Sequence, residues 1–221
     1  MNRLIQYLKE ILFPPKCILC RELLEGEQTD LCTRCRMETD DYPQEKLKLQ
    51  FIDRAAAVWY YKGNVRKALH RYKFRRGTFL ADPFGRFLAM KILSSGMEDV
   101  DLVTWVPISP IRRIFRGYDQ DELLARVVAR ELELTCAPTL KKIRHNRAQS
   151  GISGYAKRRA NVLGVYRCMD NEKVSGTRIL LVDDILTTGA TASECARVLL
   201  TAGAEKVYCA VVASAHHNNP K

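Results

Sequence analysis

The segment that most restricts how this chain folds is RILLVDDILTTGAT, which spans Arg178–Thr191. It opens with a compact apolar run at Ile179–Val182, continues through Asp183 and Asp184, and ends in small and hydroxyl-bearing residues. Apolar residues then recur at helical spacing, and a second β-rich run follows at Val207–Ala213. A strand, a helix and a strand in this order predict a parallel βαβ unit within an α/β sheet.

The remainder of the chain supports the same class. Further strands are expected at Ala55–Tyr61, Leu102–Val106 and Thr139–Ile143, and helices at Val65–Phe74, Phe79–Leu93 and Asp121–Leu134. A length of 221 residues suits one main domain with a small appendage. We therefore expect an N-terminal module at residues 1–40, a polar joint at Thr39–Gln50, and a large α/β domain at residues 51–221.

Charge and hydropathy restrict the partners and the environment. The 36 Lys and Arg exceed the 25 Asp and Glu, and the resulting charge of +11 favours a polyanionic partner, either a phosphorylated metabolite or a nucleic acid. No apolar run approaches the roughly 20 residues of a membrane-spanning helix, so no integral membrane segment is expected. Met1–Leu12 carries a helical apolar stripe, but Gln6, Lys9 and Glu10 interrupt it too often for a signal peptide. This pattern predicts a cytoplasmic protein, in which the stripe docks on its own domain or on a partner.

Four of the eight cysteines form two Cys-x-x-Cys pairs separated by eleven residues. They are Cys17, Cys20, Cys32 and Cys35. Two such pairs provide four thiolates for one tetrahedral Zn²⁺, and a full set of protein ligands is typical of a structural site without a catalytic water. Redox pairs and buried thiols are the alternatives, but a redox Cys-x-x-Cys usually belongs to a thioredoxin-like domain.

The residues after the Ile179–Val182 run have the chemistry of a ligand site. Ligands bind beyond the carboxyl ends of strands in open parallel sheets. The residues there that suit a phosphate are Thr187, Thr188, Gly189, Ala190 and Thr191, through backbone amides, three hydroxyls and the following helix dipole. Asp183 and Asp184 suit the hydroxyls of a sugar, or an associated Mg²⁺. The simpler alternative is a strand that ends in an Asp-capped turn, with threonines that only cap the next helix.

VDDILTTGAT resembles the phosphoribosyl-diphosphate loop of type I phosphoribosyltransferases, and most of the chain resembles one branch of them, the ComF (competence protein FC) family. The pattern of that family occurs as LHRYKFRRG at Leu69–Gly77, VPISPIRRIFRGYDQDELLAR at Val106–Arg126 and AQSGISGYAKRRANVLGVY at Ala148–Tyr166, after the cysteine module. The chain departs from it at Tyr118 and Asp119, where Phe-Asn is usual. The resemblance implies a parallel-sheet type I phosphoribosyltransferase-like core with a small N-terminal zinc module.

The resemblance also assigns roles to residues. It implies that Asp183 and Asp184, the candidate catalytic residues, contact the ribose hydroxyls, and that Thr187–Thr191 wraps the 5′-phosphate. Val106–Gly117 resembles the pyrophosphate loop, and the candidate diphosphate ligands in it are Ser109, Arg112, Arg113 and Arg116. Arg144–Arg159 resembles the mobile hood of these enzymes. The alternative for Val106–Gly117 is a solvated basic loop, and the alternative for Arg144–Arg159 is a surface loop without a catalytic role.

A basic and aromatic stretch at Tyr60–Gly77 contains no acid. Its cations are suited to the phosphates of single-stranded nucleic acid while bases stack on its rings. The candidate nucleic-acid residues are Arg66, Lys67, Arg71, Lys73, Arg75 and Arg76. The alternative is that the aromatics belong to the core and the cations form a solvated helix face. The family resemblance implies DNA uptake in natural transformation, with single-stranded DNA and proteins of the DNA-uptake machinery as partners.

Two functional hypotheses result. The first is an enzyme that transfers phosphoribose from phosphoribosyl diphosphate to an unidentified acceptor with Mg²⁺. The second is a non-catalytic module that senses phosphoribosyl diphosphate and binds single-stranded DNA. A zinc-containing DNA reader without a sugar-phosphate pocket is a third alternative. The sequence identifies neither a general base nor the acceptor.

Overall fold

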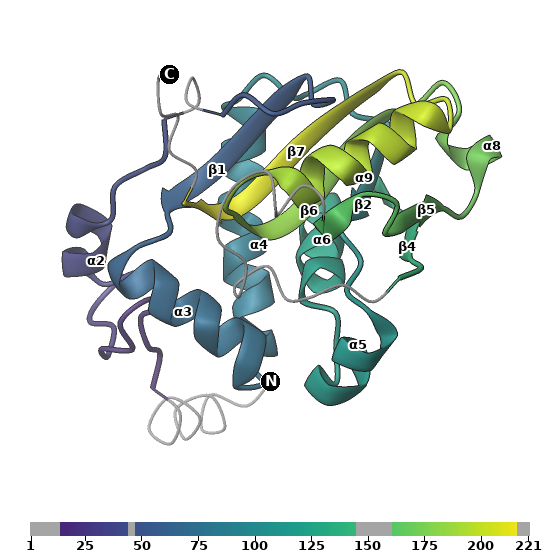
Figure 1. The fold of residues 1–221 in the computed structure, drawn as a ribbon. Helices are drawn as coiled ribbons and strands as arrows, with labels where there is room; N and C mark the ends of the chain where they lie inside the picture. The colour runs from purple at the N-terminus through teal and green to yellow at the C-terminus, as the bar shows by residue number, and fades with distance from the viewer. Residues whose placement is uncertain (1–13, 44–46, 145–160, 216–221) are drawn as a thin grey trace, which may run out of the picture.

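The computed structural model describes residues 14–43, 47–144 and 161–215 (Figure 1). Met1–Leu12 and nearly all of the expected hood at Arg144–Arg159 lie outside these ranges. A five-stranded parallel sheet occupies the centre in the order β1-β7-β6-β2-β3. Its strands are β1 (Arg54–Tyr60), β2 (Leu102–Trp105), β3 (Thr135–Cys136), β6 (Arg178–Leu186) and β7 (Lys206–Ser214). The predicted parallel α/β sheet is confirmed.

Helices cover both faces of this sheet. They are α3 (Gly63–Phe74), α4 (Ala81–Leu93, which follows the 3-10 turn η2 at Thr78–Leu80), α6 (Gln120–Glu131) and α9 (Ala190–Thr201). Helix α9 lies on one face, and α4 and α6 lie on the other (Figure 1). Because side chains alternate along a strand, Leu180 and Val182 join the core beneath α4 and α6, whereas Ile179 and Leu181 join the core beneath α9. The sheet therefore separates two apolar layers.

The strand connections run in opposite directions on either side of the junction of β6 and β2, which we call the step in the sheet. From β6 the chain passes through α9 to β7, and from β2 it passes through α6 to β3 on the other side. Strand β2 pairs with β6 only as far as Trp105 and Val182, while β6 continues to Leu186 beside β7. The edge of β6 beyond Val182 therefore faces a crevice where the strand connections diverge, which is where ligands bind in sheets of this kind.

Four elements differ from the sequence-based expectation. Strand β6 extends to Leu186, so Asp183 and Asp184 lie within it and do not follow it, because β7 supplies backbone partners along this length. The strand expected at Thr139–Ile143 is β4 (Leu140–Lys142), and it pairs antiparallel with β5 (Tyr166–Cys168) outside the main sheet. A short helix, α8 (Asn171–Val174), connects β5 to β6.

The fourth element is a helix, α5 (Pro110–Arg116), in the segment that resembles a pyrophosphate loop. Ser109 caps it by accepting a hydrogen bond from the backbone N–H of Arg112, and Pro110 occupies its first turn, where a missing N–H has no cost. Gly117 ends it with φ +83°. The signals for both ends are therefore present in the sequence.

The cysteine module, with its short helix α2 (Thr33–Glu38), packs against α3 and α4 (Figure 1). Arg71 of α3 donates to the carbonyl oxygens of Ile18 and Leu19 at 2.7 and 2.9 Å. Arg86 of α4 donates to both carboxylate oxygens of Asp30 at 2.9 Å. The buried residues of the module thus belong to the same apolar cluster as those of α3 and α4. Within the described ranges, no helix has the length and apolar character needed to span a bilayer.

Candidate functional site

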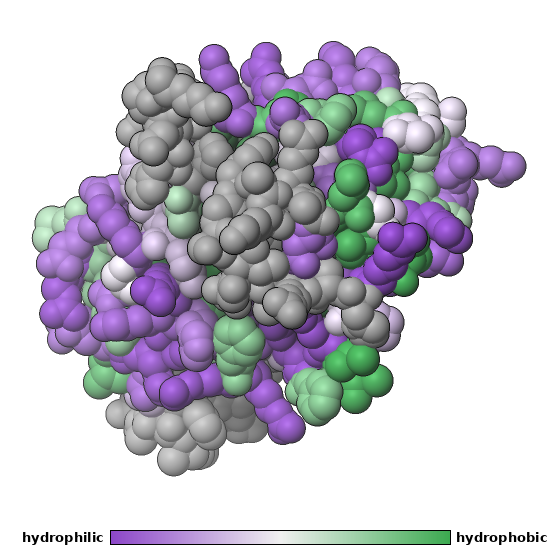
Figure 2. Space-filling view, in the orientation of Figure 1, coloured by the Kyte–Doolittle hydropathy of each residue, from purple (hydrophilic) through white to green (hydrophobic). Residues whose placement is uncertain are grey.

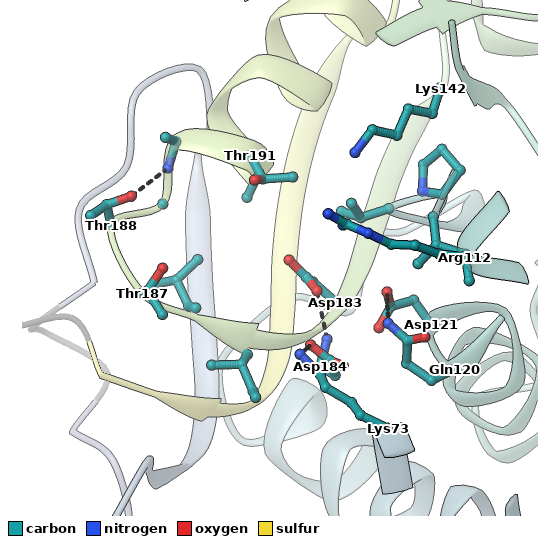
Figure 3. Close-up of a pocket in the computed structure, with 18 of the residues that line it drawn as sticks. Lys73, Arg112, Gln120, Asp121, Lys142, Asp183, Asp184, Thr187, Thr188 and Thr191 are labelled. Atoms are coloured by element: carbon teal, nitrogen blue, oxygen red, sulfur yellow. Dashed lines mark hydrogen bonds and ion pairs between the residues drawn. The ribbon is translucent and has the colours of Figure 1, made fainter. Parts of the chain in front are cut away.

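A cavity of about 580 Å³ opens at the step between β6 and β2 (Figure 3). Its walls come from the end of β6 and the start of α9, from the segment that joins β2 to α6, from α3, and from the β4-β5 pair. The polar and charged side chains that line it include Arg66, Lys73, Arg112, Arg116, Gln120, Asp121, Lys142, Tyr166, Asp183, Asp184, Thr187, Thr188 and Thr191. Segments distant in sequence therefore converge at the expected edge of the sheet.

One wall is the turn from β6 into α9, at Thr187–Gly189. Gly189 caps the helix with φ +75°, a backbone conformation that residues with a Cβ rarely adopt. A Cβ at this position would lie 2.3 Å from Leu49 Cδ2, because the preceding joint passes close to the turn. The first turn of α9 presents backbone N–H groups without acceptors inside the helix, which is the usual anion-binding geometry of a helix N-terminus.

A cluster of three carboxylates forms the centre of the cavity (Figure 3). Asp183 and Asp184 come from β6, and Asp121 comes from the first turn of α6; each contributes an oxygen that lies within 4.8 Å of the others. Lys73 of α3 pairs with Asp184, with 2.9 Å between Nζ and Oδ1. Gln120 Nε2 donates to Asp121 Oδ2 at 2.9 Å, and Arg116 in turn donates to Gln120 Oε1.

Burial and mutual repulsion shift the protonation of this cluster. Burial, followed by the charge of Asp184, raises the pKa of Asp183 to about 8. Burial also raises the pKa of Asp121, and both carboxylates of β6 add to that shift. Burial alone would lower the pKa of Lys73, but the neighbouring Asp184 and Asp121 outweigh it and raise that pKa. The ammonium of Lys73 is thus kept charged by acids that repel one another.

The opposite wall of the cavity is cationic. Arg112 and Lys142 extend toward Asp183 from α5 and β4 (Figure 3). Burial, together with the charge of Arg112, lowers the pKa of Lys142 to about 8. Arg116 lines the cavity beside Phe74, with its guanidinium carbon 5.1 Å from the ring centroid. The cavity therefore joins a helix N-terminus, an acidic centre and a basic wall.

The candidate diphosphate residues fall into two groups. Arg112 and Arg116 line the cavity, whereas Ser109 and Arg113 are not among the lining residues. Ser109 is buried and caps α5, and Arg113 pairs with Glu122 at 3.1 Å. These two side chains support the helix that carries the other two.

Tyr118 and Asp119, where the chain departs from the family pattern, have structural roles. Asp119 caps α6 by accepting from the backbone N–H groups of Asp121 and Glu122, and its other oxygen accepts from that of Ile108 at 3.2 Å. The carboxylate thereby ties the segment after β2 to the start of α6. The hydroxyl of Tyr118 donates to the carbonyl oxygen of Tyr72 in α3. Both departures thus hold the frame of the cavity.

Several lining residues were not predicted from the sequence. The sequence indicates Asp121 only as the start of a helix and Lys142 only as a strand position, and Gln120 and Tyr166 occur only within stretches that resemble the family pattern. The position of Lys142 at the end of an expected strand was the available signal, since strand ends supply binding residues. No comparable local signal distinguishes Asp121, because its proximity to β6 depends on how α6 packs on the sheet.

The six candidate nucleic-acid residues are placed differently. Lys73 pairs with Asp184 in the cavity, Arg71 holds the cysteine module, and Arg66 lines the cavity mouth. Lys67, Arg75 and Arg76 are exposed. Phe74 of α3, Phe79 of η2 and Phe115 of α5 are 62%, 72% and 88% exposed. Figure 2 shows an apolar patch at the position of α5, flanked by hydrophilic surface.

The four sulfurs of the cysteine module lie within 4.8 Å of one another, and Cys20 Sγ is 3.6 Å from Cys32 Sγ. Two thiolates on a tetrahedral Zn²⁺ lie about 3.8 Å apart, given a Zn–S bond of about 2.3 Å. The backbone N–H of Cys35 donates to Cys32 Sγ, and Asn64 of α3 donates to Cys35 Sγ. The residues therefore fit a closed, structural zinc site.

Comparisons with known proteins agree with both parts of the chain. Residues 8–46 match the model of the double zinc ribbon domain, and residues 122–221 match that of the phosphoribosyl transferase domain. The solved structure of glutamine phosphoribosylpyrophosphate amidotransferase from B. subtilis is 21% identical, with a TM-score of 0.44 over 63% of this chain and 30% of that one.

Relatives align along most of the length. The DNA utilization protein YhgH of Salmonella typhimurium is 30% identical over 88% of this chain and 94% of its own. Competence protein F of Haemophilus influenzae is 23% identical over 87% of this chain and 93% of its own, and competence protein ComFC of Streptococcus pneumoniae is 32% identical over 68% and 64%. The chain belongs to the ComF family, in which a four-cysteine zinc-ribbon module precedes a type I phosphoribosyltransferase-like domain.

Proposed function

We propose that the cavity binds phosphoribosyl diphosphate with Mg²⁺ and transfers phosphoribose to an acceptor. The observation that carries this proposal is the single cavity in which the Thr187–Thr191 turn, the acids of β6 and the cationic wall meet. Each part suits a different portion of one ligand: a helix N-terminus for the 5′-phosphate, carboxylates for the ribose hydroxyls, and cations for the diphosphate. The match of residues 122–221 to the phosphoribosyl transferase domain supports the same reading.

The residues have distinct roles in this proposal. Thr187, Thr188, Gly189, Ala190 and Thr191 surround the 5′-phosphate through amides and hydroxyls. Asp183 and Asp184 accept hydrogen bonds from the ribose and stabilise positive charge as it develops at the anomeric carbon. Arg112 and Arg116, with Lys142, neutralise the diphosphate, while Ser109 and Arg113 hold α5 in position. Bound Mg²⁺ supplies further neutralisation of the departing diphosphate oxygens.

A second candidate function is a non-catalytic module that senses phosphoribosyl diphosphate and binds single-stranded DNA. The exposed Phe74, Phe79 and Phe115 favour DNA binding, because they lie in segments that also carry exposed cations, so that bases can stack on the rings while the cations contact phosphates. The names of the relatives, competence protein and DNA utilization protein, agree with a role in handling imported single-stranded DNA alongside proteins of the uptake machinery.

Calorimetry with phosphoribosyl diphosphate and Mg²⁺ tests the shared part of these proposals. Wild-type protein is expected to bind one ligand per chain, and Asp183→Asn with Asp184→Asn is expected to abolish the binding. The matched control is Glu98→Gln, an exposed acid that precedes β2 at the opposite edge of the sheet. Equal binding by the double variant and the wild type contradicts the proposed site.

Diphosphate release then distinguishes the two candidates. Release that depends on an added acceptor, such as a nucleobase, an amine or an oligonucleotide, supports the transferase. Ligand binding without release for any acceptor class supports the sensing module. In that case, binding of a labelled single-stranded oligonucleotide, with and without phosphoribosyl diphosphate, measures whether the two ligands are coupled.

A further inference from the structure

The carboxylate cluster contains two oxygens that the protein leaves unsatisfied. Asp121 and Asp184 are each 2% exposed, and Asp121 Oδ1 and Asp184 Oδ2 have no hydrogen-bond partner among the described residues. A buried carboxylate oxygen without a partner is costly, since it has lost water and gained nothing in return. Both oxygens belong to the group of three carboxylates within 4.8 Å of one another. The two orphaned oxygens therefore belong to carboxylates of one cluster, and that cluster lines the cavity.

The charges around this cluster do not balance. Within the described part of the chain, Lys73 alone is ion-paired with any of the three carboxylates, through Asp184 Oδ1. The hydrogen bonds of Gln120 to Asp121 Oδ2 and of the Asp184 N–H to Asp183 Oδ1 carry no full charge. One ammonium thus faces three carboxylates, which leaves two negative charges when all are ionised. Arg112, Arg116 and Lys142 line the same cavity, but in the ranges that the structure describes none of them forms an ion pair with the three carboxylates.

We propose that Asp121, Asp183 and Asp184 form a binding site for one hard divalent cation, such as Mg²⁺ or Mn²⁺, that is occupied without any sugar-phosphate ligand. A cation of charge two matches the uncompensated charge, and all three donors are carboxylate oxygens, which hard cations prefer. Oxygens on opposite sides of Mg²⁺ lie about 4.2 Å apart, since each bond is about 2.1 Å long. The cluster, within 4.8 Å, is close to this size before any cation draws it together.

The ligand that this inference adds is Asp121. It belongs to α6, across the crevice from β6, so a cation held by all three acids joins the two sides of the step in the sheet. Lys73 keeps its contact with Asp184 Oδ1, because the orphaned oxygen of that residue is Oδ2. The inference rests on the proposed function only for the role of the cation, which would be held in place before phosphoribosyl diphosphate enters.

Titration of the zinc-loaded, full-length protein with Mn²⁺, followed by electron paramagnetic resonance without phosphoribosyl diphosphate, tests the site. Wild-type protein is expected to bind one Mn²⁺ per chain, in competition with Mg²⁺. Asp121→Asn keeps the size of the side chain and is expected to weaken binding by about tenfold or more. Asp184→Asn is expected to do the same, and the control Glu98→Gln is expected to bind as the wild type does.

Two results overturn the inference: absence of stoichiometric Mn²⁺ binding by the wild type, or wild-type affinity in Asp121→Asn. If Asp121→Asn does not fold, as judged by circular dichroism, Asp184→Asn decides in its place by the same criterion. Calorimetry with phosphoribosyl diphosphate and Mg²⁺ is a separate measurement. If the protein binds phosphoribosyl diphosphate but takes up no Mn²⁺ in its absence, the cation site is refuted and the proposed function stands. If the protein binds Mn²⁺ but not phosphoribosyl diphosphate, the proposed function is refuted and the cation site stands.

Discussion

The turn from β6 into α9 offers the sharpest test of how the structure holds its proposed phosphate wall. In Gly189→Ala, the new Cβ meets two separate obstacles. The backbone has φ +75°, where an L-residue with a Cβ is disfavoured by about 1 to 2 kcal/mol, partly offset by about 0.4 to 1 kcal/mol from a less flexible unfolded chain. The Cβ also lies 2.3 Å from Leu49 Cδ2, so Leu49 must leave its rotamer at about 0.5 to 1.5 kcal/mol. The expected loss is about 2 kcal/mol.

Urea denaturation of the zinc-loaded protein measures this loss. The matched control is Gly176→Ala, because Gly176 has φ +70° with nothing within 4 Å of a Cβ, and it is expected to lose only the backbone part, about 1 kcal/mol. A cycle with Leu49→Ala separates the contact, since Gly189→Ala is expected to cost about 1 kcal/mol less when Leu49 is already truncated. Equal losses in Gly189→Ala and Gly176→Ala, together with no coupling to Leu49, refute the reasoning.

Three other perturbations have defined outcomes. Removal of zinc, by chelation or by Cys35→Ser, is expected to loosen α3 and α4 along with the module, and hydrogen exchange that changes only in the module contradicts this. The hydrogen bonds from Arg178 lower the pKa of Asp101 to about 2, so this pair stabilises the fold above about pH 4 and loses its effect as the pH falls through 2. In acid titrations, Asp101→Asn is therefore expected to lose less stability over that pH range than the wild type does. Phe115→Ala is expected to weaken binding of a labelled single-stranded oligonucleotide about tenfold at constant salt, and unchanged affinity argues against stacking at α5.

The sequence predicts those parts of the fold that depend on local periodicity. The apolar run of β6, the helical spacing of α9 and the β-rich run of β7 are each visible within about ten residues, and together they specify one parallel βαβ unit. The turn at Thr187–Gly189 is equally local, because its small residues and its glycine lie next to one another in the chain. The presence and place of a ligand pocket at the end of β6 could therefore be anticipated.

Features that depend on packing between distant segments could not be read in this way. Asp121 enters the cavity because α6 crosses the sheet at the level where β2 ends, and no pattern within α6 fixes that level. In the sequence, Lys73 is one cation of a basic stretch, whereas in the structure α3 directs its side chain to Asp184. The end of β2 at Trp105, four residues short of the end of β6, is a property of strand pairing that neither strand contains.

Helix α3 explains why the cysteine module and the cavity are parts of one structure. Arg71 and Lys73 are two positions apart, and residues at that spacing lie on nearly opposite sides of a helix. One side of α3 is bound to the module by the contacts of Arg71 with Ile18 and Leu19, and the other carries the ammonium that pairs with Asp184. A shift of α3 would therefore move the only cation that is paired with the acids among the described residues. The module thus stabilises the position of a cavity side chain without lining the cavity itself, which gives a structural reason for the two to occur in one chain.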